Sequence, residues 1–365
     1  MKLETQREQL LALLQHVIGV VERRQTLPIL SNVLVIAENS KLLFTATDLE
    51  VELSAWDNLL AIDDGKATLP ARKLLDILRA LPEGEQVSLT VEGAKAQLRS
   101  GRSRFALATL PVEDMPTLES FDVQGSITLR QRDLKALIEA TQFAMAQQDV
   151  RYYLNGLLLE VGDNTLRAVA TDGHRLALSD KPAHIEVDVG QQVIVPRKGV
   201  QELSRLLADD DSEVEIKLGG SHIHIALGDI RFTSKLIDGK FPDYQRAIPV
   251  ESERVLVADR NQLRSALSRA SILSNENRGV RLNLEDWLLR IQANNPEQEE
   301  AEEEIEVNYS GGSLEIGFNV AYLLDAMGAL QGELVKIFFN DANSSCLLRE
   351  AESEDSRYVI SPMRL

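Results

Sequence analysis

The chain has 365 residues, of which 44% are hydrophobic and 26% are charged, and this balance is typical of a soluble globular protein with two or three domains. The longest apolar runs, such as 157–159, are too short to span a membrane, and the N-terminus lacks the apolar core of a signal peptide. We therefore expect a cytoplasmic protein without a membrane partner. The formal net charge of −18, taken alone, argues against a nucleic-acid partner, because such a surface repels a polyanion.

The first third of the chain has the pattern of a helix, a strand, a second helix and another strand. Apolar residues recur at helical spacing over 8–18 and 69–78, and strand-like patterns cover 33–36 and 103–107. The same order returns twice, with helices at 133–143, 195–203, 261–272 and 318–327 and strands at 155–161, 230–234, 280–284 and 356–360. Pro70 and Pro196 mark helix starts, since proline in the first turn costs no hydrogen bond.

Matching positions give the period of this repeat. Two sets are separated by between 124 and 129 residues: Leu10, Leu134 and Leu263, and Arg104, Arg231 and Arg357. Short polar connections that contain proline, at 111–122 and 242–253, separate the copies. The sequence therefore predicts an α+β protein with three domains, at 1–120, 121–250 and 251–365, each with two helices and several strands.

The segment TDGHRL at 171–176 offers a hydroxyl, a carboxylate, an imidazole and a guanidinium around one glycine. TDLE at 47–50 and NNPE at 294–297 follow apolar runs in the corresponding places. A catalytic cluster is seldom built three times, so we interpret the segment as a repeated structural position. The single cysteine, Cys346, cannot form an internal disulfide and is expected to be a small buried apolar residue.

Charge is divided unevenly between the predicted helices and the rest of the chain. The helical segments at 6–24, 71–80, 130–147, 196–207, 259–275 and 319–331 hold fifteen lysines and arginines against eight acids, a sum of +7. Everything else then carries −25. Helix surfaces are often basic, because arginine and lysine are good helix formers. Three repeats with their helices on one side would nevertheless give a shared cationic surface for a polyanion, with anionic sheets elsewhere.

Six motifs along the whole chain then point to a family. They are TLPIL at 26–30, SGRSRF at 100–105, QDVRYYLNG at 148–156, TDGHRL at 171–176, NNPEQEE at 294–300 and PMRL at 362–365. With them the chain resembles the beta subunit of bacterial DNA polymerase III, the sliding clamp. The resemblance implies the DNA clamp fold, with three tandem repeats that each pack two helices on antiparallel sheets and together form half of a closed ring.

The resemblance also implies a function and partners. The chain is expected to form a head-to-tail homodimer that encircles double-stranded DNA without sequence specificity. The ring would be a non-catalytic processivity factor that needs no cofactor and no metal. It would tether the polymerase alpha subunit, the clamp loader delta subunit and other proteins with clamp-binding motifs. Candidates for DNA contact, transferred by position, are Arg24, Arg72, Gln148, Tyr152, Tyr153, Arg197 and Lys198. Cations on a pore wall would contact phosphates without reading bases.

A peptide groove between the second and third domains is implied as well. Its apolar walls would take hydrophobic anchors of partner peptides, and its polar groups would bind the peptide backbone or acids. Ala247 and Ser361 are smaller or more polar than is usual in the family. The groove residues are Leu154, Thr171, Asp172, Gly173, His174, Arg175, Leu176, Pro242, Arg246, Ala247, Asn319, Tyr322, Val359, Ser361, Pro362, Met363 and Arg364.

For the contact between protomers the resemblance indicates one apolar set and one charged set. Leu107 of the first domain would meet Ile272 and Leu273 of the third. Lys73, Arg102 and Arg104 would match the acidic run that includes Glu297, Glu299, Glu300 and Glu303. The acidic run is also explained by simple solvation, since exposed ion pairs contribute little.

Two other classes of function compete with this interpretation. A hydrolase would use Asp172, His174 and Ser179, but the sequence has no nucleophile-elbow glycines, no phosphate loop and no metal-ligand spacing. A repeat scaffold that binds proteins but not DNA would need no excess of helical cations. Shuffling those charges would leave such a scaffold working.

Overall fold

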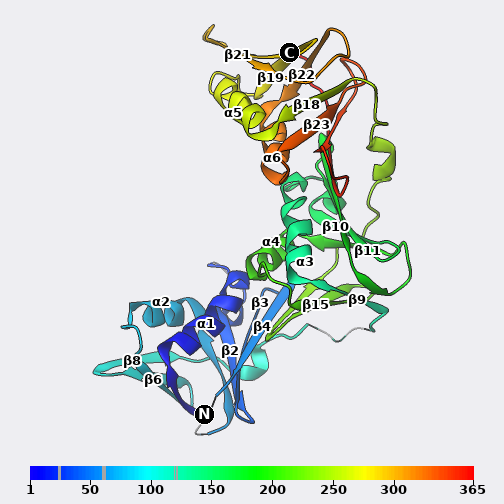
Figure 1. The fold of residues 1–365 in the computed structure, drawn as a ribbon. Helices are drawn as coiled ribbons and strands as arrows, with labels where there is room; N and C mark the ends of the chain where they lie inside the picture. Colours follow the sequence, from blue (N-terminus) through cyan, green and yellow to red (C-terminus); the bar gives the residue numbers. More distant parts are fainter. Residues whose placement is uncertain (24–25, 60–62, 119, 121) are drawn as a thin grey trace. The chain divides into compact units, whose positions relative to one another are not determined.

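A computed structural model of the chain describes residues 1–23, 26–59, 63–118, 120 and 122–365. These residues repeat one order of elements three times, as strand, helix, four strands, helix and three strands, with one additional short strand in the middle copy (Figure 1). The first copy consists of β1 (Lys2–Gln6), α1 (Arg7–Val17), β2 (Asn32–Glu38), β3 (Lys41–Thr47), β4 (Val51–Asn58), β5 (Gly65–Pro70), α2 (Ala71–Ala80), β6 (Gln86–Glu92), β7 (Lys95–Ser100) and β8 (Ser103–Ala108).

The second and third copies keep this order. The second consists of β9 (Gly125–Arg130), α3 (Gln131–Glu139), β10 (Gly156–Val161), β11 (Thr165–Thr171), β12 (Arg175–Pro182), the added β13 (His184–Glu186), β14 (Gln192–Pro196), α4 (Arg197–Leu206), β15 (Glu213–Leu218), β16 (His222–Leu227) and β17 (Ile230–Lys235). The third consists of β18 (Val255–Asp259), α5 (Arg260–Ser271), β19 (Gly279–Glu285), β20 (Leu288–Asn294), β21 (Glu300–Glu306), β22 (Leu314–Asn319), α6 (Val320–Ala329), β23 (Leu334–Phe338), β24 (Cys346–Glu350) and β25 (Ser356–Ile360). The predicted α+β repeat is confirmed.

Two of the predicted helical segments were too long. The segments 6–24 and 130–147 contain α-helix only to Val17 and Glu139, and short 3₁₀ turns follow at Ile18–Val20 and Gln142–Ala144. The Thr141 hydroxyl donates to the Leu137 carbonyl over 2.6 Å, while the Thr141 N–H bonds to the Ile138 carbonyl instead. A side chain that occupies the acceptor of the next helical turn favours termination. Arg23, counted with the first helix, therefore lies beyond it.

Antiparallel pairing joins strands of neighbouring copies, so the chain divides into two compact units that differ from the sequence repeats. The first unit is Met1–Arg132 with His184–Val187 and Gln201–Leu236, and the second unit holds the rest. The first unit holds a four-stranded sheet, β1-β6-β7-β8, and a nine-stranded sheet, β13-β9-β15-β16-β17-β4-β3-β2-β5. The second unit holds an eight-stranded sheet, β14-β10-β11-β12-β25-β24-β23-β18, and a four-stranded sheet, β21-β20-β19-β22.

Buried and exposed side chains alternate along the strands and show which face of each sheet belongs to the core. In β3 the side chains of Leu42, Phe44 and Ala46 are buried, and α1 packs on β3 and β4 through an apolar face that includes Leu10 and Leu14. Successive residues of a strand point to opposite faces, so Leu43 and its neighbours form the other face of the sheet. The third repeat is built in the same way, with α5 packed on β20 and β21. No helix among the described residues is long and apolar enough to span a membrane.

Candidate functional site

The segment 171–176 forms a tight turn between β11 and β12, and the segment 47–52 forms the same turn between β3 and β4. The hydroxyls of Thr171 and Thr47 donate to the carbonyls of Arg175 and Val51 over 2.6 Å and 3.0 Å. In both turns the aspartate that follows the threonine accepts backbone N–H bonds from the start of the next strand. Threonine and aspartate side chains stabilise such turns by these local bonds. The prediction of a repeated structural position is confirmed for these two copies.

The third copy of the turn uses different chemistry in the same place between β20 and β21. Asn295 accepts the Glu299 N–H through its side-chain oxygen over 3.0 Å, and its amide donates to the Glu299 carboxylate over 2.7 Å. The slot is conserved as a hairpin turn, while the side chains that hold it change.

The residues suggested for a hydrolase are not assembled into a reactive group. Ser179 is fully buried, and its hydroxyl lies 2.9 Å from the Ser356 hydroxyl. Asp172 bonds to the N–H groups of His174 and Arg175 and to the Arg175 guanidinium. A nucleophile must be within hydrogen-bond reach of its base, and no bond among the described residues joins the buried Ser179 hydroxyl to the His174 imidazole. Asp172, His174 and Ser179 therefore do not form the hydrolytic set that this alternative requires.

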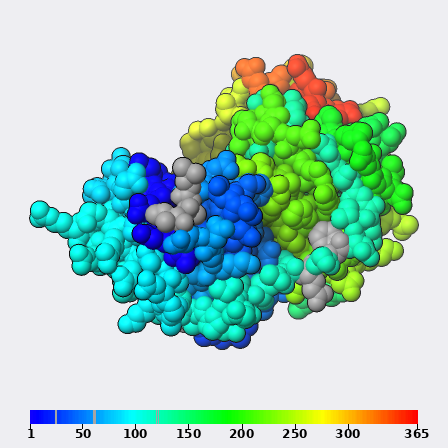
Figure 2. All heavy atoms as spheres, turned by 90° about the horizontal axis from the view of Figure 1, so that it is seen from below, coloured from blue at the N-terminus to red at the C-terminus, as the bar shows by residue number. Residues whose placement is uncertain are grey.

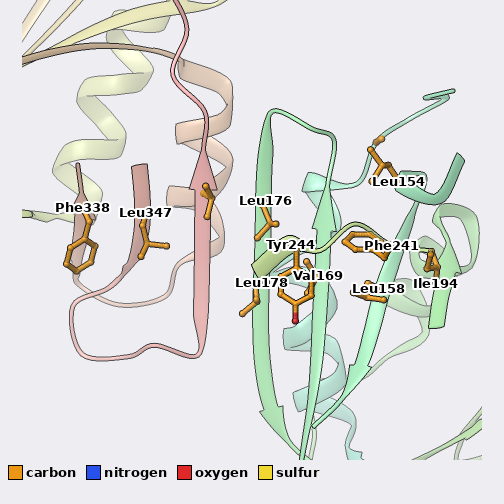
Figure 3. Close-up of a cluster of buried hydrophobic side chains, with 12 residues drawn as sticks. Leu154, Leu158, Val169, Leu176, Leu178, Ile194, Phe241, Tyr244, Phe338 and Leu347 are labelled. Atoms are coloured by element: carbon orange, nitrogen blue, oxygen red, sulfur yellow. The ribbon is translucent and has the colours of Figure 1, made fainter. Parts of the chain in front are cut away.

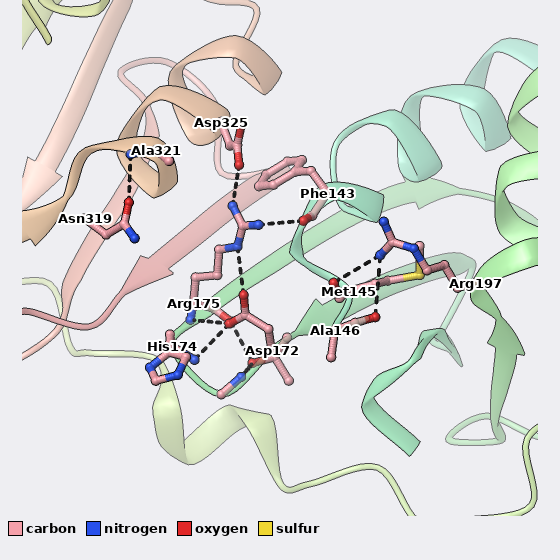
Figure 4. Close-up of polar contacts among 12 residues, drawn as sticks. Phe143, Met145, Ala146, Asp172, His174, Arg175, Arg197, Asn319, Ala321 and Asp325 are labelled. Atoms are coloured by element: carbon pink, nitrogen blue, oxygen red, sulfur yellow. Dashed lines mark hydrogen bonds and ion pairs between the residues drawn. The ribbon is translucent and has the colours of Figure 1, made fainter. Parts of the chain in front are cut away.

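Arg175 links the turn to helix α6 of the third repeat. Its guanidinium pairs with Asp172 over 3.2 Å and with Asp325, and it donates to the Phe143 carbonyl over 2.8 Å (Figure 4). The guanidinium carbon also lies 4.5 Å from the ring centroid of Tyr322. A planar guanidinium can satisfy carboxylates, a carbonyl and an aromatic face together. Two residues predicted for the groove, Arg175 and Tyr322, are thereby held in contact.

Apolar side chains from the second and third repeats meet beside this turn. Leu176 of β12 pairs with Val359 of β25, which pairs with Leu347 of β24, which pairs with Phe338 of β23. These residues belong to one buried cluster with Leu154 (Figure 3). Of the predicted groove residues, Leu154, Leu176 and Val359 are therefore floor residues with at most 5% of their surface exposed.

The C-terminal tail lies against the same turn. The Ser361 N–H donates to the His174 carbonyl over 3.0 Å, and the Met363 N–H donates to the Gly317 carbonyl over 2.9 Å. A Cβ atom added at Gly317 would lie 2.6 Å from the Met363 carbonyl oxygen, so glycine is needed for this close approach. The tail residues 361–363 are half-buried, whereas Arg364 is exposed.

The remaining predicted groove residues have varied environments. Pro242, Arg246 and Ala247 are exposed, and Arg246 pairs with Asp243 over 2.8 Å. Asn319 caps helix α6, because its side chain accepts the Ala321 N–H over 2.9 Å. Asn319 thus has a structural role independent of any ligand.

Sequence reasoning missed the aromatic residues that complete the cluster. Phe241 and Tyr244 lie in the connection between the second and third repeats and are 4% exposed, as they cover the sheet beside Leu158 (Figure 3). The Tyr244 hydroxyl donates to Glu160 over 2.6 Å, and burial, followed by this carboxylate, raises the pKa of Tyr244. Two aromatic residues within one polar connection, FPDY at 241–244, were a signal that could have been used.

The candidates for DNA contact fall into separate places. Arg24 lies outside the described residues. Gln148 and Tyr152 are exposed on the loop before β10, where Gln148 has a φ of 55° and Tyr152 is 56% exposed. Tyr152 and Tyr153 form an edge-to-face pair with centroids 5.6 Å apart. This loop is anchored by Arg151, whose hydrogen bonds lower the pKa of Asp149 to about 2.

Several arginines counted on the helices bind backbone carbonyls. Arg7, first in α1, donates to the Leu78 carbonyl near the end of α2 over 2.6 Å. Arg260, first in α5, donates to the Met327 carbonyl near the end of α6 over 3.0 Å. Such cations stabilise helix C-termini. Further carbonyl bonds are Arg72 to Val21, Arg197 to Met145 and Arg205 to Gln15. These cations keep their charge, but part of their hydrogen bonding is structural.

The residues predicted for the protomer contact differ in their exposure in the single chain. Leu107 of β8 is 8% exposed. Ile272 is 76% exposed, Leu273 is half-buried, and Lys73, Arg102 and Arg104 are exposed. Most of the acidic run forms β21, where Glu303 pairs with Arg269 over 2.8 Å and Glu304 pairs with Arg290 over 2.8 Å.

Cys346 is 1% exposed, and burial raises the pKa of its thiol to about 12, so the expectation of a small buried residue is confirmed. The described residues contain no group of three or more histidines, cysteines, aspartates or glutamates that could hold a metal ion.

Comparison with known proteins places this fold in a family. Residues 1–119, 128–243 and 245–364 match the families described as the N-terminal, central and C-terminal domains of the DNA polymerase III beta subunit. The beta sliding clamp of Pseudomonas aeruginosa is 56% identical over 362 residues, 99% of both chains, and that of Escherichia coli K12 is 49% identical over 367 residues, all of both. A crystal structure of the Pseudomonas aeruginosa clamp bound to griselimycin superposes with a TM-score of 0.97 at 55% identity over all of both chains. The chain with this threefold architecture belongs to the DNA polymerase III beta subunits, the beta sliding clamps.

Proposed function

We propose that two copies of this chain close head to tail into a ring around duplex DNA and tether the replicative polymerase to its template. The observation that carries this proposal is a rule of strand pairing within the chain. The last strand of the second repeat, β17, pairs with β4, the third strand between the two helices of the first repeat. In the same way the last strand of the third repeat, β25, pairs with β12, the third strand between the two helices of the second repeat. The corresponding strands left as sheet edges are β8 in the first repeat and β21 in the third.

Applied once more, the rule pairs β8 of one protomer with β21 of its partner. Arg231 lies opposite Ser54 and Arg357 lies opposite Leu178. Arg104 is the matching arginine of β8. Glu302 of β21 matches Ser54 and Leu178, because each of the three pairs with the residue two positions before the end of the preceding strand. An unpaired edge favours addition of a strand, and opposite charges across the pair favour this register. Two such contacts related by a two-fold axis close the ring.

The excess of +7 on the helical segments supports passage of DNA through this ring. Exposed candidates for phosphate contact are Arg72 and Gln148 with Tyr152, while Tyr153, Arg197 and Lys198 are half-buried. Charge contacts with phosphates carry no sequence information, which suits a clamp that must move along any duplex. The ring acts in the cytoplasm as a non-catalytic processivity factor, and its domains extend over 1–120, 121–250 and 251–365.

The turn at 171–176, the tail and the apolar cluster support a site for partner peptides. The row Leu176, Val359, Leu347 and Phe338 offers apolar contact, and His174 and Arg246 are exposed polar groups at its border. A short peptide recognised in this way buries hydrophobic anchors and hydrogen-bonds its backbone at the rim. The partners proposed for this groove are the polymerase alpha subunit, the clamp loader delta subunit and other proteins with clamp-binding motifs.

Retention on circular DNA tests the ring directly. The clamp is loaded onto nicked circular plasmid by its clamp loader and ATP and then passed through a gel-filtration column. We expect it to stay on the circle in salt that abolishes binding to a short linear duplex, because phosphate contacts weaken steeply with salt while a closed ring does not. Cutting the plasmid should release it. Equal release from circular and cut DNA would contradict encirclement.

A further inference from the structure

We propose that the first unit carries a second binding site, on its nine-stranded sheet, for a short acidic peptide segment with neighbouring large apolar side chains. The site is a cavity of about 640 Å³, a size typical of ligand pockets. Its lining includes Ile36, Leu43 and Trp56 with Glu52, His224 and Arg231. All of these residues belong to the first unit, and the proposal is independent of the peptide groove proposed above.

An apolar row on the solvent side of the sheet forms one wall. Ile36 of β2 pairs with Leu43 of β3, and Leu43 pairs with Trp56 of β4. The three side chains are half-buried, although they face away from helix α1. Ile36 packs in part against the buried cluster of Ile29, Leu30, Leu34 and Met115. Antiparallel sheets with one covered face normally have polar residues on the other, so the continuation of the row to Leu43 and Trp56 requires an explanation.

The row becomes distinctive when compared with its counterpart in the next repeat. The turns at Thr47 and Thr171 are equivalent, so positions 36, 43 and 56 correspond to Glu160, Arg167 and Asp180. There the row is charged and closed, because Arg167 pairs with Asp180 over 2.7 Å and donates to the Tyr244 hydroxyl over 3.1 Å. The corresponding connection of the first repeat, 111–122, contains no tyrosine, so it has no hydroxyl to hold a charged row in this way.

A neighbouring row on the same face of each sheet shows the reverse difference: it is apolar in the second unit and polar in the first. In the second unit it is Leu176, Val359, Leu347 and Phe338, the apolar row of the peptide groove. The equivalent row of the first unit is polar and consists of Glu52, Thr233, His224 and Lys217. Apolar and polar rows have thus changed places between two equivalent sheets. The first unit offers its apolar contact on a different row of the same face, beside the boundary between β4 and β17.

Figure 2 shows the blue atoms of the first repeat adjoining the yellow-green atoms of β15 to β17 on one face of the molecule. At this boundary the Arg231 guanidinium carbon lies 4.4 Å from the centroid of a Trp56 ring. Its Nη1 donates to the carbonyls of Gly228 and Ile230 over 2.7 Å and 3.0 Å. These bonds and the indole fix the guanidinium, and among the bonds of the described residues they leave Nε and Nη2 as donors for a ligand.

The chemistry of the occupant follows from these walls. Two neighbouring apolar side chains can lie on the row Ile36, Leu43 and Trp56, because successive strands are spaced by about 4.8 Å. A carboxylate next to them would reach Arg231, whereas Lys41 of the lining lies opposite Glu38 in the pairing of β2 with β3 and is balanced by that carboxylate. Glu52 accepts the Leu118 N–H over 3.1 Å, so that carboxylate is occupied by the chain itself. An acidic segment of a partner protein fits this arrangement better than a basic one.

The test uses the indole of the site as its own reporter. The chain has two tryptophans, so Trp287→Phe in the intact dimer leaves Trp56 as the only indole. The probe is acetyl-Leu-Phe-Asp-Asp-amide, and its charge control is acetyl-Leu-Phe-Asn-Asn-amide. We expect the acidic peptide to change Trp56 fluorescence saturably and the Asn form to bind at least about tenfold more weakly, because a charge-assisted hydrogen bond is lost.

Variants separate this site from the peptide groove. Arg231→Gln should weaken the acidic peptide about tenfold, whereas Arg99→Gln, an exposed arginine of β7, should leave its affinity unchanged. Deleting residues 361–365 should also leave it unchanged, since that tail belongs to the second unit. No saturable response up to about 1 mM peptide, equal affinity for the two peptides, or loss of binding on tail deletion would each overturn the proposal. The two-peptide comparison needs no variant at position 231 and therefore does not depend on how that variant folds.

Discussion

Individual side chains in this clamp often serve the fold where their types suggest a ligand. Asp172 and Thr171 hold a turn, Asn319 caps a helix and Arg7 binds the end of another helix. Each makes bonds within its own chain that a search for reactive groups would assign to a substrate. The groups that differ between equivalent positions are more informative, because the shared fold does not explain them.

Glu52 is a group of this kind, and its buried charge lowers the stability of the folded chain. Burial raises its pKa, although the Leu118 N–H that it accepts acts in the opposite direction. A carboxyl whose pKa is higher in the folded than in the unfolded chain loses stability as pH rises through that interval. Glu52→Gln keeps an acceptor for Leu118 and removes the charge. We expect it to stabilise the protein at pH 7 by a few tenths of a kcal/mol, since the half-buried carboxyl keeps part of its hydration.

Urea unfolding at two pH values checks this effect. The advantage of Glu52→Gln should disappear below about pH 4, where the wild-type carboxyl is itself protonated. Glu50→Gln is the matched control, because Glu50 is exposed and its pairing with Lys235 spans 3.8 Å. It should change stability little at either pH. An equal gain at both pH values would mean that burial of the charge is not the cause.

At the scale of elements, the C-terminal tail acts as a short extra segment laid across two parts of the second unit. It bonds to the His174 carbonyl in the turn before β12 and to the Gly317 carbonyl in β22. Leu365 would collide with a Cβ added at Gly279 or Gly317, so the tail packs directly against backbone. Neither bond involves β21, the edge proposed for the protomer contact.

Removal of residues 361–365 should therefore separate peptide binding from assembly. We expect the truncated chain to remain a dimer by light scattering and to lose binding of a clamp-binding peptide of the polymerase alpha subunit, measured by calorimetric titration. The physical reason is that the tail forms one wall of the groove, whereas β8 and β21 keep their edges. Undiminished affinity in the truncated dimer would place the groove elsewhere.

At the scale of the whole molecule, the same pairing rule that joins repeats within the chain predicts the joint between chains. The internal joints lie between β4 and β17 and between β12 and β25, and the proposed joint lies between β21 and β8. This makes one register, with Arg104 opposite Glu302, a specific consequence of the repeat. Exposed ion pairs stabilise weakly, but like charges directly opposite each other in a sheet are destabilising.

A charge exchange tests that register. Arg104→Glu and Glu302→Arg, made singly, should each shift native mass toward the monomer, because each places like charges on facing strands. The double variant should restore the dimer, since the pair is reversed and complete. Lys95→Glu on the neighbouring strand β7 is the control, because Lys95 is exposed and lies opposite Ala108, and it should leave the dimer intact. A double variant no more dimeric than either single one would contradict the predicted register.

The sequence by itself determined the threefold repeat, the order of helices and strands and the family, because helical and strand periodicity and turn chemistry are local properties of the chain. It overestimated helices where Thr141 diverts a backbone bond.

Only the tertiary structure decided which strands of different repeats share a sheet. That pairing places Phe338 and Leu347 beside Leu176, and Arg231 beside Trp56, across long stretches of sequence. Such neighbours arise when hydrogen-bonded sheet edges meet, and no local pattern encodes which edge meets which. The roles of the apolar and polar rows on the two equivalent sheets became visible for the same reason.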